Sequence, residues 1–130
     1  TLVPQPALKA AARKTRAGVI YFGSTAPAMD EALHALAEQG VHLDALRLRA
    51  FPFPQSVREF VDSHDLVFVV EQNRDAQMRT LLVNELQIEP AQLASVLHYD
   101  GTPITARYIA QAITKQVLAF AITPRKERVS

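Results

Sequence analysis

Five consecutive apolar residues, Leu66 to Val70 (LVFVV), constrain the fold of this chain more than any other stretch. A strand with one face in water alternates apolar and polar side chains, and this run shows no alternation. It therefore predicts a strand that is covered on both faces, as the central strands of parallel sheets are. A chain of 130 residues is long enough to bury such a strand within one domain.

Apolar patterns on both sides of this run alternate between strand and helix. The first predicted helix should stop at Gly40. Strands separated by helices of this length indicate β-α-β units, whose right-handed crossovers place helices on both sides of a sheet. We therefore predict an α/β fold with a doubly wound, mostly parallel sheet and helices on both faces. The predicted strands are 17–23, 41–50, 66–70 and 94–99, and the predicted helices are 28–40, 56–64, 78–86 and 104–120.

The α/β domain is predicted to span residues 17–123. Residues 1–16 contain two prolines and four basic side chains. They indicate an entry linker with a short basic helix or, as we prefer, a solvated arm. Residues 124–130 (PRKERVS) predict a polar tail. The domain would thus lie between two polar segments.

Composition excludes several classes of function. The formal net charge of +1 gives no electrostatic reason to expect nucleic acid or a membrane surface as a partner. The chain contains no cysteine, which excludes disulfides and iron–sulfur clusters bound by its own cysteines. No apolar run approaches the roughly 20 residues that a membrane span needs.

Four loops follow the predicted strands, at residues 23–27, 49–55, 71–77 and 99–105. In a doubly wound sheet, ligands and partners meet the loops at the carboxyl ends of the strands. This edge of the sheet is therefore the candidate functional surface.

Gly23, Ser24 and Thr25 join the first long strand to its helix. Free amides and the helix dipole at such a turn can hold an anion. The alternative, which we favour, is that Gly23 makes the bend and Ser24 or Thr25 caps the helix. A single glycine does not support a dinucleotide or P-loop motif.

The tetrapeptide Phe51-Pro52-Phe53-Pro54 is the most unusual in the chain. Its prolines fix the backbone of the loop and offer two aromatic rings. Either both rings pack on the core of the domain, or at least one anchors another domain.

The buried strand ends in a polar cluster, Glu71 to Asp75. Glu71 could serve as a general acid or base, and Arg74 could bind a phosphate or carboxylate. The alternative is that Asn73 or Asp75 caps the next helix while Arg74 is solvated. Glu71 is harder to explain in this way, because an acid at the end of a buried strand needs a partner.

Asp100-Gly101 predicts a turn in which Gly101 has a positive φ. The four histidines are scattered, without metal-ligand spacing or a readable Ser–His–Asp arrangement. They are predicted to be surface or satisfied structural residues. They are His34, His42, His64 and His98.

Five motifs in order over residues 18–107 resemble the C-terminal, transketolase-like domain of the alpha subunit of 2-oxoacid:ferredoxin (acceptor) oxidoreductases of the 2-oxoglutarate or pyruvate type. The resemblance departs at Ala76, where the turn of the family is expected to have glycine. The motifs are GVIYFGST, EAL..LAEQGV, LRLRAFPFP, VFVVEQNRDAQ and SVLHYDGTPITAR.

The resemblance implies a parent enzyme of the cytoplasm that uses thiamine diphosphate and magnesium. That enzyme would oxidatively decarboxylate a 2-oxoacid with coenzyme A, giving an acyl-CoA, carbon dioxide and reduced ferredoxin. Iron–sulfur clusters would lie on other domains or subunits, and this domain would bind no cofactor itself. Its implied partners are the pyrimidine-binding domain of the same alpha subunit and the beta subunit, and such a domain can border the approach of coenzyme A or substrate.

Under this resemblance the loop edge faces a neighbouring domain. Glu71, Asn73, Arg74 and Gln77 would orient the domain there, and residues 51–54 would seat it. Such a seam predicts an apolar patch beside the loops and no deep pocket.

Two other functions remain open from the sequence. A stand-alone small-molecule-binding or regulatory module would bind an anion at the Gly23–Thr25 turn and show a closed pocket lined by Ser24, Asn73 and Gly101. A small independent enzyme would use Glu71 as its acid or base. The sequence thus offers three functional hypotheses for one edge of the sheet.

Overall fold

The computed structural model describes residues 6–11, 15–48, 54–72 and 75–122. The strands are β1 (Ala7–Lys9), β2 (Ala17–Phe22), β3 (Asp44–Leu48), β4 (Leu66–Glu71) and β5 (Leu93–Leu97). The α-helices are α1 (Ala26–Glu38), α2 (Gln55–Asp62), α3 (Gln77–Leu86) and α4 (Ala106–Ile122). Short 3-10 helices cover Gly23–Thr25 and Pro90–Gln92.

The strands form one sheet in the order β1-β3-β2-β4-β5. Strands β3, β2, β4 and β5 are parallel, and β1 joins β3 antiparallel. Every residue of β4 is buried, as the LVFVV run predicts. Because β2 lies between β3 and β4, the chain leaves β2 toward one side of the sheet and later returns to the other. The carboxyl ends of β2 and β4 therefore form the topological switch point.

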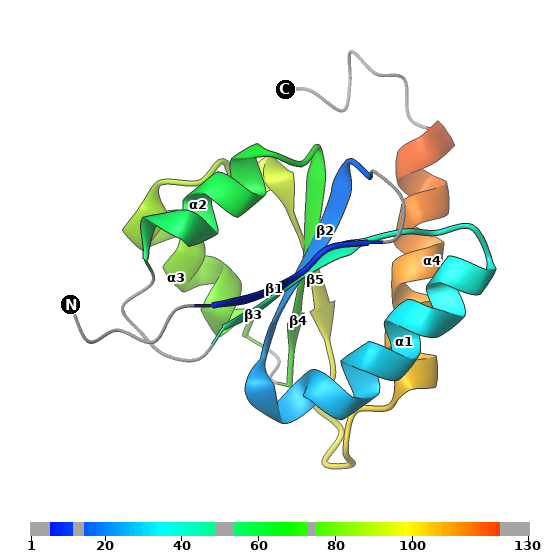
Figure 1. The fold of residues 1–130 in the computed structure, drawn as a ribbon. Coiled ribbons are helices and arrows are strands. Elements are labelled where there is room, and N and C mark those ends of the chain that lie inside the picture. Colours follow the sequence, from blue (N-terminus) through cyan, green and yellow to red (C-terminus); the bar gives the residue numbers. More distant parts are fainter. Residues whose placement is uncertain (1–5, 12–14, 49–53, 73–74, 123–130) are drawn as a thin grey trace.

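Helices cover both faces of the sheet (Figure 1). Helices α1 and α4 pack together on one face, over a core that includes Val19, Phe68 and Ile113. Helices α2 and α3 cover the other face, over Ile20 and Val69 among others. The predicted α/β fold, with a doubly wound, mostly parallel sheet and helices on both faces, is confirmed.

All four predicted strands and all four predicted helices are present, with boundaries shifted by a few residues. Gly40 follows α1 with a φ of +86°, as a helix stop requires. Within α3, Met78 and Leu82 are buried, whereas Leu81 is 39% exposed.

The leading segment differs from its prediction. Ala7–Lys9 form an edge strand on β3, not a helix. The backbone amide of Ala11 then donates to Asp44 Oδ1 (2.8 Å), which ties this segment to the start of β3. The predicted domain boundaries at residues 16/17 and 123/124 stay predictions. Among the described residues, no helix is long and apolar enough to cross a membrane.

Candidate functional site

An open hollow of about 260 Å³ lies at the switch point. It brings together three of the predicted site residues, Thr25, Glu71 and Gln77, from the ends of β2 and β4 and the start of α3. These residues were predicted from the sequence because ligands and partners bind at the carboxyl ends of the strands in such sheets. The lining residues are Phe22, Thr25, Val70, Glu71, Gln72, Gln77, Met78 and Leu81.

Glu71 is only 4% exposed at the end of β4, and its partner is the start of α3. Its Oε1 accepts a hydrogen bond from the Met78 amide (2.6 Å), and its Oε2 accepts one from the Arg79 amide (3.0 Å). The first amides of a helix lack partners within the helix, and the helix dipole favours a negative charge there. Glu71 therefore holds the helix in place, and its carboxylate is not a free acid or base.

The turn between Glu71 and α3 depends on an unusual backbone. Ala76 is the N-cap of α3, and it adopts the left-handed conformation (φ 50°, ψ 46°). Alanine has no side-chain oxygen, so the cap position makes no side-chain bond. The amides of Met78 and Arg79 are held by Glu71. Asn73, one of the two predicted caps, lies outside the described residues. The turn thus keeps a conformation that favours glycine, although alanine occupies it.

Thr25 links two loops of the edge. It is buried at the N-cap position of α1, but it makes no side-chain cap bond. Its Oγ1 instead accepts a hydrogen bond from Gln72 Nε2 (3.2 Å), on the loop after β4. The predicted cap by Thr25 is therefore wrong, and the side chain of Ser24 lies outside the described residues.

Arg47 is a neighbour of this edge that the sequence analysis missed. Its guanidinium lies against the Gly23 turn and donates to the Gly23 carbonyl at 3.4 Å. A Cβ atom at Gly23 would lie 2.9 Å from Arg47 Nη2, so glycine makes room for the guanidinium. Arg47 Nε is buried and, among the described residues, has no hydrogen-bond partner. A cation near the carboxyl end of a strand was the available sequence signal.

Tyr21 lies beside Arg47 in the parallel register of β2 and β3. Burial raises the pKa of the Tyr21 phenol, and the charge of Asp30 adds to this rise, while Arg47 acts in the opposite direction. The carboxyl end of β2 therefore combines a buried phenol with two opposite charges.

The Asp100-Gly101 turn lies apart from the hollow and contributes none of its lining. Gly101 has a φ of +88°, as predicted. Asp100 Oδ1 accepts hydrogen bonds from the Thr102 amide (3.0 Å) and the Thr102 hydroxyl (2.6 Å). These bonds, followed by the nearby His98, lower the pKa of the Asp100 carboxyl. This acid therefore stabilises its own turn.

The structure brings Ser63, His64 and Asp44 together where α2 ends and β3 begins. His64 Nε2 lies 2.8 Å from Asp44 Oδ2, and Ser63 Oγ lies 3.1 Å from His64 Nδ1. However, Nδ1 lies only 2.6 Å from the Phe60 carbonyl oxygen, and the Ser63 hydroxyl donates to that same carbonyl (2.8 Å). Nδ1 is thus committed to an acceptor and is not placed to take the serine proton. The buried His64 is a satisfied structural residue, as predicted.

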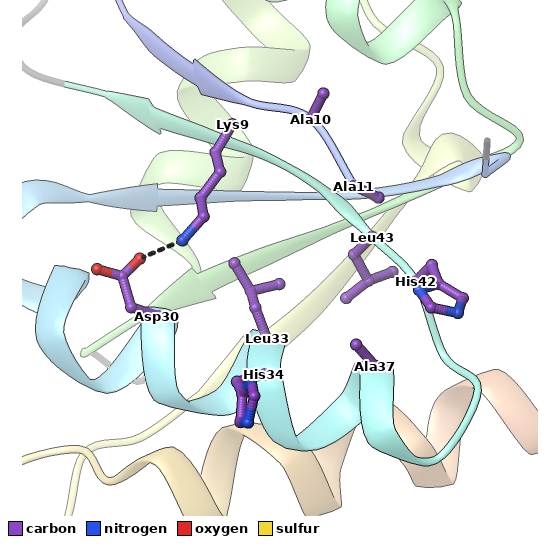
Figure 2. Close-up of a pocket in the computed structure, with 9 residues that line it drawn as sticks. All are labelled: Lys9, Ala10, Ala11, Asp30, Leu33, His34, Ala37, His42 and Leu43. Carbon is purple, nitrogen blue, oxygen red and sulfur yellow. Dashed lines mark hydrogen bonds and ion pairs between the residues drawn. The ribbon is translucent and has the colours of Figure 1, made fainter. Parts of the chain in front are cut away.

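A small pocket of about 160 Å³ lies between β1 and α1 (Figure 2). Figure 2 shows Lys9 reaching from β1 to Asp30 on α1, with Nζ and Oδ1 3.4 Å apart. His34 and His42 also line it, from α1 and from the segment before β3. Within the described ranges, no group of three or more histidine and acidic side chains could hold a metal ion. The polar lining of this pocket therefore consists of the exposed Lys9–Asp30 ion pair and two surface histidines, His34 and His42.

Four predicted site residues, Phe51, Phe53, Asn73 and Arg74, lie outside the described residues. Their roles stay predictions.

No family model and no curated protein matches the chain. Solved structures do match. The 2-oxoglutarate:ferredoxin oxidoreductase from Magnetococcus marinus, with 2-oxoglutarate, coenzyme A and succinyl-CoA bound, has a TM-score of 0.76 and 20% identity. The match covers 89% of this chain, which spans only 20% of that chain, and at this identity it shows the fold alone.

The alpha chain of a probable 2-oxoacid ferredoxin oxidoreductase from Thermoplasma acidophilum is similar in length. Its TM-score is 0.56 at 25% identity, and the match covers 88% of this chain and 97% of that chain. Motifs and fold thus agree, and the resemblance of this chain to a domain of the 2-oxoacid:ferredoxin oxidoreductases is confirmed over nearly nine tenths of its length.

Proposed function

We propose that the chain is the transketolase-like assembly domain of a 2-oxoacid:ferredoxin oxidoreductase alpha subunit and that it is not catalytic by itself. The observation that carries this proposal is the buried Glu71, whose two oxygens bind the start of α3. Glu71, the best candidate for a catalytic acid or base, therefore has a structural role at the loop edge. The hollow next to it is open, and it is flanked by Phe22 (37% exposed) and Leu81 (39% exposed). An apolar patch beside an open loop edge is what a seam between domains requires.

Arg47 supports the same proposal. A buried donor that stays unpaired costs about 1–3 kcal/mol, so an acceptor is expected for Arg47 Nε. A carboxylate on the adjoining domain would meet this need once the part of this chain that covers Nε moves aside, because guanidinium groups bind carboxylates in a forked geometry. Docking would then bury Phe22 and Leu81 and pair Arg47 at the same time.

In this proposal the chemistry belongs to the remainder of a cytoplasmic parent enzyme. The pyrimidine-binding domain of the alpha subunit and the beta subunit would hold thiamine diphosphate and magnesium. Since the chain contains no cysteine, the ligands of the iron–sulfur clusters would come from other domains or subunits. The parent reaction would be oxidative decarboxylation of a 2-oxoacid to an acyl-CoA, and the loop edge would border the approach of coenzyme A or substrate. Neither nucleic acid nor a membrane enters the proposal.

The alternative of a stand-alone binding module has less support. It calls for a closed pocket lined by Ser24, Asn73 and Gly101. Gly101 does not line the hollow at the switch point, and the hollow is open.

Co-purification tests the proposal. The tagged chain, expressed in its own host, is expected to recover polypeptides identified by mass spectrometry as the pyrimidine-binding portion and the beta subunit of such an enzyme. Leu81→Asp should abolish this recovery. Leu118→Asp is the matched control, because Leu118 is 63% exposed on α4, away from the hollow. Recovery that Leu81→Asp and Leu118→Asp affect equally would contradict the seam.

A second arm separates the alternatives. The purified chain is titrated with coenzyme A while backbone amide shifts are followed by NMR, and it is assayed alone with 2-oxoglutarate and an artificial electron acceptor. Shifts confined to the loops after β2 and β4 would support an edge that borders coenzyme A. Turnover by the chain alone would overturn the assembly-domain proposal.

A further inference from the structure

β5 is one of the two edge strands of the sheet. An edge strand presents unpaired backbone groups, which form a template for another strand from a partner or a second copy. Leu93–Leu97 is five residues long, which is enough to accept such a strand. The fate of its outward-facing backbone groups therefore decides whether this side of the sheet is open to partners.

The register identifies which groups of β5 face outward. The His98 amide donates to the Glu71 carbonyl on β4 (3.0 Å), so the residues in phase with His98 face β4. Along a parallel strand, alternate residues direct both backbone groups to the same neighbour. The carbonyls and amides of Leu93, Ser95 and Leu97 therefore point away from β4, toward the open side.

Each of these three carbonyls accepts a side-chain hydrogen bond. Arg79 Nε of α3 donates to the Leu93 carbonyl (3.3 Å). Gln116 Nε2 of α4 donates to the Ser95 carbonyl (3.0 Å), and the Tyr108 hydroxyl of α4 donates to the Leu97 carbonyl. Helices α3 and α4 cover opposite faces of the sheet, so the edge is held from both sides.

We propose that Arg79, Gln116 and Tyr108 block strand addition at the β5 edge by occupying its outward carbonyls. A further strand would have to displace all three bonds before its own amides could reach the carbonyls. Each lost bond costs about 1 kcal/mol, which corresponds to about fivefold in affinity, so the three together are a substantial barrier. Partners of this chain are thereby confined to its other surfaces. This inference stands whether or not the chain assembles in the manner proposed above.

The test uses a peptide that adds a strand. A synthetic peptide with the sequence of residues 93–99, LASVLHY, is added to the labelled chain, and the backbone amide shifts of β5 are followed by NMR. The variant is Tyr108→Phe combined with Gln116→Ala. Tyr108→Phe removes only the hydroxyl and keeps the ring, whose centroid packs 4.8 Å from that of His98. Gln111→Ala, an exposed glutamine on the same helix, is the matched control.

We expect no β5 shifts for the wild type or the Gln111→Ala control, and saturable shifts at Leu93, Ser95 and Leu97 for the double variant, with affinity at least about tenfold higher. Circular dichroism verifies the fold. If the double variant does not fold, the single variants enter the same titration, each with an expected gain of about fivefold. Wild-type binding along β5 would overturn the proposal, and so would a folded variant whose β5 amides do not respond.

Discussion

An acidic side chain accepts two hydrogen bonds at the end of β4 and another does so after β5. The two acids differ in how far along the chain their donors lie. Glu71 is 4% exposed and bonds amides seven and eight residues further along, inside α3. Asp100 has a side chain that is 67% exposed, and it bonds Thr102 two residues away. The same chemistry therefore fixes a helix to the sheet in one loop, whereas in the other it shapes a turn beside His98, whose Nε2 lies 3.3 Å from Asp100 Oδ1. The burial of the acid and the distance along the chain to its donors, rather than its residue type, decide whether it supports the fold.

The largest expected effect comes from Glu71→Ala. The substitution leaves the amides of Met78 and Arg79 without their acceptor at a buried position, so the free energy of unfolding should fall by about 3 kcal/mol. Urea unfolding followed by circular dichroism measures it. Glu85→Ala, an exposed position of α3, is the control and should change stability by less than about 0.5 kcal/mol. If Glu71→Ala and Glu85→Ala lowered the free energy of unfolding equally, Glu71 would support the fold no more than an exposed glutamate does.

The second prediction concerns Ala76, which sets the path from Glu71 into α3. Its left-handed backbone is unfavourable for alanine by about 1–2 kcal/mol, and glycine relieves this at some cost in chain entropy. Ala76→Gly should therefore stabilise the chain by about 1 kcal/mol in thermal or urea unfolding. Ala35→Gly, inside α1, should have the opposite sign by a similar amount. A loss of stability for Ala76→Gly would show that the turn is not left-handed.

A smaller loss of stability is expected from breaking the hydrogen bond between Thr25, in the turn after β2, and Gln72, in the loop after β4. Thr25→Val keeps the shape of a buried side chain but removes the acceptor for Gln72 Nε2, and should cost about 0.5 kcal/mol. Gln72→Ala should cost about as much, and the double variant no more than either single one, because both remove the same bond. A full double-mutant cycle by urea unfolding measures the coupling. Additive losses would mean that the two loops are independent.

The smallest effect belongs to Asp100. Its pKa is held below the ordinary value of 3.8 by the Thr102 hydroxyl and amide, so the folded state favours the carboxylate. The resulting stability is complete well above pH 3.8 and is lost as the pH falls through the lower, folded-state pKa. Asp100→Asn should flatten this part of the acid limb when melting temperature is measured against pH. An unchanged acid limb would mean that Asp100 contributes nothing even to its own turn.

Much of the fold could be predicted because it follows from local patterns. The unbroken LVFVV run predicted a buried strand, Gly40 predicted the end of a helix, and Gly101 predicted a positive φ. The edge strand Ala7–Lys9 was missed because three residues carry no readable period and because their partner, β3, lies far along the chain. Leu81 fits a helical stripe in sequence, but the width of the buried face depends on how α3 tilts over the sheet.

The candidate site was predictable in position but not in detail. The strand-end rule grouped Thr25, Glu71 and Gln77 correctly, and burial of an acid correctly demanded a partner. The identity of that partner depends on the left-handed Ala76, which brings the first amides of α3 back to the strand. The position of Arg47 beside Gly23 depends on the register of two strands, which the sequence alone does not reveal.

The bond from Glu71 to α3 also bears on the order in which the chain folds. It joins residues seven and eight positions apart, whereas the neighbouring β2–β4 pair joins Ala17 to Leu66 across two helices and a strand. A short loop loses little entropy when it closes, whereas contacts between distant residues form slowly. The corner of strand, turn and helix can therefore form before the parallel sheet is complete. Glu71 would then act at the nucleus, and its removal would lower the folding rate more than it raises the unfolding rate. The acid that holds the edge of the finished domain would thus also help set how fast the domain forms.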